Sequence, residues 1–153
     1  MTLTIETRSP EATRAIARHL AQVLRPGDVL ALTGALGAGK TCFVQGLAEG
    51  LGVTGRVASP TFILMRAHRG PLPLYHADAY RLESGTDLLD IGLEEWLATG
   101  VVALEWADLA PEVLPRDHLA LRIEVNGEGR QLHFSGHGPR SRTLVEHLRA
   151  CAS

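Results

Sequence analysis

The sequence contains Gly34-Ala35-Leu36-Gly37-Ala38-Gly39-Lys40-Thr41, which has the pattern G-x-x-x-x-G-K-[ST] of a phosphate-binding loop. Residues 29–32 before it, Val-Leu-Ala-Leu, form a short apolar run that is typical of a buried parallel strand. After it, Phe43, Leu47 and Leu51 recur every fourth residue, as on one face of a helix. A strand, a glycine-rich loop and a helix in this order distinguish a phosphate-binding loop from a chance turn, and they predict an α/β fold.

The loop carries the residue types that bind the phosphates of a nucleotide. Its glycines let backbone N–H groups turn inward around a phosphate, and the helix N-terminus adds partial positive charge there. Lys40 can reach the β- and γ-phosphates, and the Thr41 hydroxyl can ligate Mg²⁺. Of the 15 basic residues, 14 are arginines, so the one lysine of the sequence stands where a compact ammonium is required.

The composition is that of a globular protein with one domain, residues 1–153, because 45% of the residues are hydrophobic and 21% are charged. No apolar run approaches the roughly 20 residues of a membrane span, and the N-terminus shows no secretion signal. Cys42 and Cys151 have no metal-binding spacing, which favours free thiols and a cytoplasmic location. The net charge of −2 argues against a broad direct contact with nucleic-acid phosphates.

Helix and strand signals continue on both sides of the loop. Residues 9–11, Ser-Pro-Glu, are a helix start, and positions 12, 16, 20 and 24 are the predicted apolar stripe of that helix. The other predicted elements are strands at 2–6, 56–68, 74–78, 101–106, 119–125 and 131–135, and helices at 87–98 and 141–150. This order predicts a three-layer sandwich like that of P-loop NTPases, with a central, mostly parallel sheet and antiparallel additions.

An acidic residue follows the apolar strand at 101–104. Ligands of such sheets bind beyond the carboxyl ends of the strands, so Glu105 is predicted to lie on the same edge as the loop. In phosphate-loop enzymes an acid at this place holds Mg²⁺, although it is usually an Asp. Asp108 is the alternative for this role, and an ordinary acid at a strand end is the alternative without function.

Two further segments carry polar groups that suit a nucleotide site. Ser59 and Thr61 flank a proline, and such hydroxyls can sense Mg²⁺ or a γ-phosphate, although the same residues are common in turns. Asp78 can order an attacking water, and Arg81 beside Tyr80 can stabilise phosphate charge. A hydrogen-bonded cluster at a strand end explains the second segment equally well.

The remaining histidines have no spacing that suggests a metal site. Those at positions 19, 68, 118 and 147 are predicted to be solvated.

Four segments together resemble those of the bacterial tRNA threonylcarbamoyladenosine biosynthesis ATPases, the TsaE (YjeE) family. They are the phosphate loop at 34–41, Ser-Pro-Thr-Phe at 59–62, His-Ala-Asp-Ala-Tyr-Arg-Leu at 76–82 and Leu-Glu-Trp at 104–106. Their order and spacing match the family over nearly the whole chain, from about residue 9 to 130. One position departs from the pattern, because Cys42 stands where the family usually has a second Thr.

The resemblance implies a slow ATPase that uses Mg²⁺ and acts on a complex of two partner proteins, TsaD and TsaB. That complex modifies the adenosine 3′ of the anticodon, so tRNA would be contacted only indirectly. Thr41 and Glu105 would ligate Mg²⁺, and Asp78 and Trp106 would serve hydrolysis or nucleotide sensing. The nucleotide would further contact Gly37, Ala38, Gly39, Lys40, Thr41 and Cys42 in the loop, and Ser9, Thr13 and Arg130 at its edge.

Two other functions are compatible with the motifs. A small-molecule kinase would use the loop for ATP and residues 76–81 for an acceptor, although few arginines follow the loop and no lid domain is apparent. A nucleotide-dependent adaptor would exchange ATP and ADP without hydrolysing either.

Overall fold

The computed structural model describes residues 1–34, 39–53, 65–78, 93–105 and 114–152. Parts of the predicted elements therefore lie outside the described residues, namely 56–64 and 87–92. The described elements are β1 (Thr2–Thr7), α1 (Pro10–Ala21), β2 (Val29–Gly34), α2 (Lys40–Gly50), β3 (Met65–His68), β4 (Leu74–Asp78), α4 (Leu93–Thr99), β5 (Val101–Glu105), β6 (His118–Asn126), β7 (Gly129–His137) and α5 (Pro139–Ala152). None of these helices has the length and apolar composition that a membrane crossing requires.

The described strands form one seven-stranded sheet in the order β1-β7-β6-β2-β5-β4-β3. The central strands β6, β2, β5 and β4 are parallel to one another, whereas β7, β1 and β3 pair antiparallel at the two sides. The predicted α/β sheet with a mostly parallel centre and antiparallel additions is thus confirmed. The loop between β2 and α2 begins at the carboxyl edge of the parallel strands, next to the end of β5.

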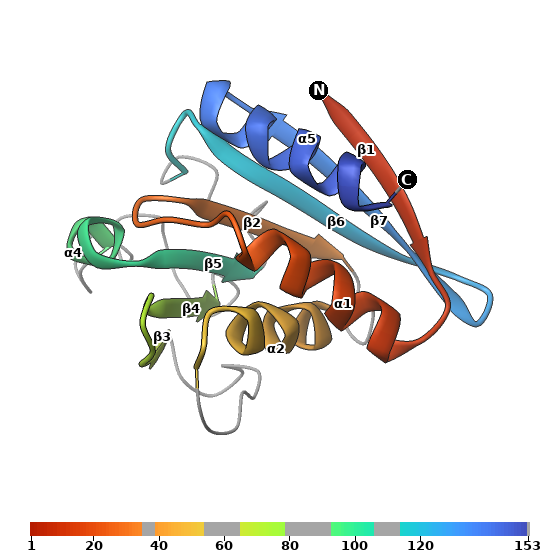
Figure 1. Ribbon diagram of the computed structural model, residues 1–153, viewed down its shortest axis with the longest axis horizontal. Coiled ribbons are helices and arrows are strands. Elements are labelled where there is room, and N and C mark those ends of the chain that lie inside the picture. The colour runs from red at the N-terminus through yellow and green to blue at the C-terminus, as the bar shows by residue number, and fades with distance from the viewer. Residues whose placement is uncertain (35–38, 54–64, 79–92, 106–113, 153) are drawn as a thin grey trace.

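Helices cover both faces of the sheet. Helices α1, α2 and α5 lie together on one face, as Figure 1 shows. Alternate residues of β2 point to opposite sides, because Leu30 and Leu32 join the core under these helices while Val29 and Ala31 join the core that includes Trp96 of α4. The fold is therefore a three-layer sandwich with its larger core under α1, α2 and α5.

Helix α1 begins as the sequence predicts, but its buried face is rotated relative to the predicted stripe. The Ser9 hydroxyl accepts a hydrogen bond from the N–H of Ala12 at 3.0 Å, which makes Ser9 the N-cap. The predicted stripe at positions 12, 16, 20 and 24 is only partly right, because residues 12 and 16 are half-buried. The residues of the helix that are fully buried are Thr13, Ala17, Leu20 and Ala21.

The different face follows from close packing between α1 and α2. A Cβ atom at Gly46 would lie 2.5 Å from the carbonyl oxygen of Arg14, and one at Gly50 would lie 2.5 Å from the Cβ of Ala21. Glycine at these two positions lets the backbones of the two helices approach directly. This contact fixes the start of α1 beside the start of α2, where the phosphate loop ends.

The opposite edge of the sheet is tied to α5 by a partly buried hydrogen-bond cluster. The Asp117 carboxylate accepts bonds from the N–H of Arg140 at 2.8 Å, and from the N–H and hydroxyl of Ser141 at 2.9 and 2.6 Å. The Arg140 guanidinium in turn donates to both carboxylate oxygens of Asp28. Burial by itself would raise the pKa of Asp117, but the bonds from Ser141 and Arg140 outweigh it and hold the pKa below its usual value.

We predict that Asp117→Asn lowers the free energy of unfolding by about 1 kcal/mol at pH 7, because the amide NH2 replaces one of the two oxygens that accept hydrogen bonds from Arg140 and Ser141. A carboxylate whose pKa is lower in the folded state stabilises the fold above the usual Asp value of about 3.9, and this contribution is lost as the pH falls. Urea unfolding at pH 5, 4 and 3 should therefore show a smaller difference in the free energy of unfolding between Asp117→Asn and the unchanged protein as the pH falls. Glu146→Gln, which changes an exposed acid of α5, is the control. A difference in the free energy of unfolding that stays constant over this pH range would contradict this explanation.

Candidate functional site

The two ends of the phosphate loop require glycine. Gly34 ends β2 with φ 140°, and a Cβ there would lie 2.5 Å from the carbonyl oxygen of Ile123. Gly39 precedes α2 with φ 116°, in the left-handed region that side chains disfavour. The two predicted contacts Gly37 and Ala38 lie outside the described residues.

Lys40 is the first residue of α2, and only 5% of it is exposed. Its ammonium donates a hydrogen bond to the carbonyl oxygen of Gly34, with Nζ and O 2.7 Å apart. Lysines are rarely buried, because removing a charge from water is costly without charged or hydrogen-bonding partners. The ammonium is therefore held at the mouth of the loop, between the end of β2 and the start of α2.

The start of α2 suits an anion. Gly39 offers no side chain to cap the helix, and the first turn contains no acidic residue. Its N–H groups and the positive end of the helix are consequently directed at the loop. Thr41, the second residue of the helix, is half-buried at this same end.

The carboxyl edge of the sheet brings two acids next to the loop strand. Glu105 ends β5 and pairs with Leu32 of β2 on one side and with Asp78 of β4 on the other. Glu105 is 3% exposed, and its Oε2 is 2.5 Å from Nε2 of the fully buried His76. For Asp78 the structure describes the backbone position, at the last residue of β4. Sequence reasoning found both acids but missed His76 as the partner of Glu105.

A cavity of about 240 Å³ opens beside the start of α2. It lies between the beginnings of α1 and α2 and the β6–β7 hairpin. The three predicted edge residues, Ser9, Thr13 and Arg130, line it together with Cys42, which was predicted as a loop contact. The complete lining is Ser9, Pro10, Thr13, Gly39, Cys42, Glu128 and Arg130. The structure thus brings together residues that lie far apart in the sequence, and it adds Pro10 and Glu128, which no sequence signal marked.

Several of these side chains have internal partners. The Thr13 hydroxyl is 2.8 Å from the hydroxyl of Thr7, and both residues are buried. The Cys42 thiol donates to the carbonyl oxygen of Pro10 at 3.2 Å, and Nη1 of Arg14 lies 3.8 Å from its sulfur. Burial raises the pKa of Cys42 against the opposing effect of Arg14, so the group in the cavity wall is a neutral thiol.

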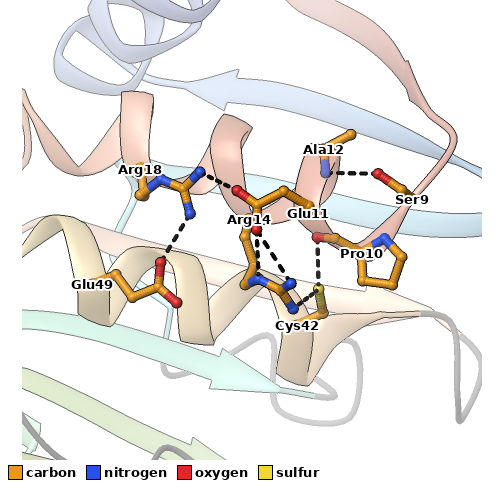
Figure 2. Close-up of polar contacts among 8 residues, drawn as sticks. All are labelled: Ser9, Pro10, Glu11, Ala12, Arg14, Arg18, Cys42 and Glu49. Carbon is orange, nitrogen blue, oxygen red and sulfur yellow. Dashed lines mark hydrogen bonds and ion pairs between the residues drawn. The ribbon is translucent and has the colours of Figure 1, made fainter.

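Figure 2 shows how ion pairs join the two helices that form this wall. Arg18 of α1 contacts Glu49 of α2 at 2.9 Å and Glu11 at 2.6 Å, and Arg14 also contacts Glu11 at 3.3 Å. Exposed ion pairs of this kind add little stability individually. Of the three, the Arg18–Glu49 pair joins α1 to α2, in the C-terminal half of each helix, and the other two lie within α1.

Other predictions have mixed outcomes. His68 is not solvated as expected but 7% exposed, because it lies on the same sheet face as His76, with their ring centroids 6.4 Å apart. His118, half-buried, stacks on His137.

The predicted residues Ser59, Thr61, Tyr80, Arg81 and Trp106 lie outside the described ranges. Within those ranges, no three His, Cys, Asp or Glu side chains form a group that could hold a metal by themselves.

Comparison with known proteins agrees with this arrangement. The model of the family "Threonylcarbamoyl adenosine biosynthesis protein TsaE" matches residues 7–132. The chain is 46% identical to the tRNA threonylcarbamoyladenosine biosynthesis protein TsaE of Bacillus subtilis, covering 93% of this chain and 90% of that one. It is 44% identical to the protein of the same name from Streptomyces coelicolor, covering 83% and 92%. The crystal structure of Bacillus subtilis YdiB superposes with a TM-score of 0.86 at 39% identity, covering 100% of this chain and 97% of that one. The chain therefore belongs to the TsaE family.

Proposed function

We propose that this protein binds ATP and hydrolyses it with Mg²⁺, and that it acts in tRNA N6-threonylcarbamoyladenosine biosynthesis. The observation that carries the proposal is the buried ammonium of Lys40 between Gly34 and α2, on the sheet edge where Glu105 ends the neighbouring strand. Phosphoryl-transfer sites use this arrangement, in which a single ammonium, an uncapped helix start and a carboxylate lie on one edge. The pathway is proposed from the names of the relatives.

The nucleotide would lie along the edge from the loop to the cavity. Lys40 and the N–H groups at the start of α2 would bind its phosphates, and Gly37 and Ala38 belong to the same loop. The 240 Å³ cavity would take the base or ribose against Ser9, Thr13, Cys42 and Arg130. The thiol of Cys42 is already bonded to Pro10, which favours a backbone rather than a side-chain contact from residue 42.

The residues at this edge fit a magnesium ion. Mg²⁺ prefers hard oxygen ligands and usually needs one or two protein oxygens plus the substrate's phosphates. The Thr41 hydroxyl and the Glu105 carboxylate would supply them, and the bound ion would neutralise charge on the β- and γ-phosphates. Glu105 is pre-oriented for this by its bond to His76.

Hydrolysis would be a matter of positioning and charge. Asp78 ends the strand next to Glu105, where its carboxylate would orient the attacking water, and Lys40 would hold the γ-phosphate in place. We assign Trp106, Ser59, Thr61, Tyr80 and Arg81 to nucleotide sensing and charge stabilisation by the family resemblance alone.

The resemblance also supplies the setting. ATP hydrolysis would reset or remodel a TsaB–TsaD complex between turnovers, and tRNA would bind to that complex. The net charge of −2 is consistent with a protein that does not itself bind nucleic acid broadly.

Lys40→Ala should weaken ATP binding by at least about 10-fold, because a hydrogen bond to a charged group contributes roughly 1.5–3 kcal/mol. Isothermal titration with a non-hydrolysable ATP analogue measures this change. Arg142→Ala removes the same charge from an exposed position of α5, at the opposite edge of the sheet, and should leave the affinity unchanged. If Lys40→Ala binds the analogue as the unchanged protein does, the loop does not hold the phosphates.

Phosphate release from ATP, followed with and without a purified TsaB–TsaD complex, tests the proposed function directly. We expect slow release that needs no added metabolite and increases when the complex is present. Release that depends strictly on an acceptor metabolite would support a kinase instead. Turnover no faster than that of Lys40→Ala, with partner binding intact, would support a non-hydrolysing adaptor.

A further inference from the structure

A buried imidazole contacts the carboxylate that ends β5. His76 is fully buried and Glu105 is 3% exposed, and the two lie on neighbouring parallel strands, β4 and β5. The distance of 2.5 Å joins Nε2 of His76 to one carboxylate oxygen, Oε2 of Glu105. A buried carboxylate without such a partner would be strongly disfavoured. The contact therefore accounts for how an acid can be held inside the edge of the sheet.

The geometry also selects the form of the imidazole. Because a carboxylate only accepts hydrogen bonds, Nε2 must carry the proton and donate it. The other ring nitrogen, Nδ1, is buried and has no hydrogen-bond partner among the residues that the structure describes. The contact with Glu105 is thus made by Nε2 as the donor, and Nδ1 takes no part in it.

We propose that His76 is a positioning residue that fixes the Glu105 carboxylate for a divalent cation. The bond from Nε2–H engages Oε2 and sets the rotation of the carboxylate, which leaves Oε1 to bind the ion that accompanies the nucleotide. Residues that orient a metal ligand in this way commonly change metal affinity by 10- to 100-fold when they are replaced. The inference rests on the proposed function, in which Glu105 is a metal ligand.

A purely structural role makes a different prediction. If His76 only satisfied a buried carboxylate, its replacement would lower stability and would disturb nucleotide binding and metal binding alike. His68 offers a comparison, because it is another buried histidine, on β3, whose ring is 6.4 Å from that of His76. Its Nε2 is buried, and no hydrogen bond joins it to any residue in the described ranges.

The test compares two substitutions of His76, by Gln and by Asn, whose amide side chains differ in length by one methylene. The amide nitrogen of Gln lies close to the position of Nε2 in histidine, so His76→Gln keeps a donor for Glu105. The shorter His76→Asn places its amide near Nδ1 and cannot reach the carboxylate. Mn²⁺ binding is measured by electron paramagnetic resonance in the presence of a non-hydrolysable ATP analogue, and binding of the analogue without metal is measured separately. His68→Asn is the control for polar substitution of a buried histidine.

We expect His76→Asn to weaken Mn²⁺ binding about 10- to 100-fold, while metal-free binding of the analogue stays within about 3-fold of the unchanged protein. His76→Gln should recover most of the loss, and His68→Asn should show none. Circular dichroism verifies folding, and His76→Phe replaces the Asn variant if that variant unfolds. The proposal is overturned if the donor-lacking variant binds Mn²⁺ normally, or if His76→Gln does not restore Mn²⁺ binding. It is also overturned if His68→Asn weakens Mn²⁺ binding as much as His76→Asn does.

Glu105→Gln separates this inference from the function on which it rests. If Glu105→Gln leaves Mn²⁺ binding unchanged, Glu105 is not a ligand and the proposed metal site is wrong. If Glu105→Gln weakens binding while His76→Asn does not, the metal site stands and the positioning role is wrong. If the metal site and the positioning role are both right, the double variant with His76→Asn and Glu105→Gln should bind Mn²⁺ about as weakly as Glu105→Gln alone. Both changes then act on one group, the carboxylate.

Discussion

Parallel pairing of β2 with β5, and of β5 with β4, is the constraint on which the site depends. This pairing brings the ends of three strands that are distant in the sequence to one edge, so that Gly34, Glu105 and Asp78 become neighbours. Helix α2 then starts at that edge and directs Lys40 back towards Gly34. The two buried faces of β2 differ in side-chain size, because Leu30 and Leu32 face the larger core and the smaller Val29 and Ala31 face the other. A slip by one residue would place each set in the core that is filled by the other.

The site concentrates groups that a stable fold would ordinarily leave in water. The ammonium of Lys40 is 5% exposed and the carboxylate of Glu105 is 3% exposed. Each has a hydrogen-bond partner of its own, Gly34 and His76, so the cost of burial is offset before any ligand binds. Such preorganisation is what binding and hydrolysis of a triphosphate require, since the charges need not be assembled when the ligand arrives.

Local patterns in the sequence predicted much of this architecture. The glycines that bound the loop, Gly34 and Gly39, the N-cap Ser9 and the acid at the end of β5 all follow from residue types at short spacing. The apolar stripe placed Leu20 and Leu24 correctly but did not predict the burial of Thr13 and Ala17, because the contact with α2 is made by Gly46 and Gly50 against the backbone and small side chains.

Contacts that depend on strand order could not be predicted from the sequence either. His76 and Glu105 are 29 positions apart, and only the placement of β4 beside β5 brings them together. The cavity beside the loop needs α1, α2 and the β6–β7 hairpin at once, which explains why Glu128 carried no signal. His68 looked like a solvated residue because its neighbour on the sheet face, His76, lies on another strand and is brought beside it only by the pairing of β3 with β4.

A crystal structure with a non-hydrolysable ATP analogue and Mn²⁺, with the ion located by its anomalous scattering, tests the central claim most directly. The account predicts the triphosphate against Lys40 and the start of α2, the nucleoside in the cavity lined by Ser9 and Arg130, and Mn²⁺ bound to Thr41 and Glu105. A triphosphate bound elsewhere on the molecule, or an ion away from Glu105, would contradict it.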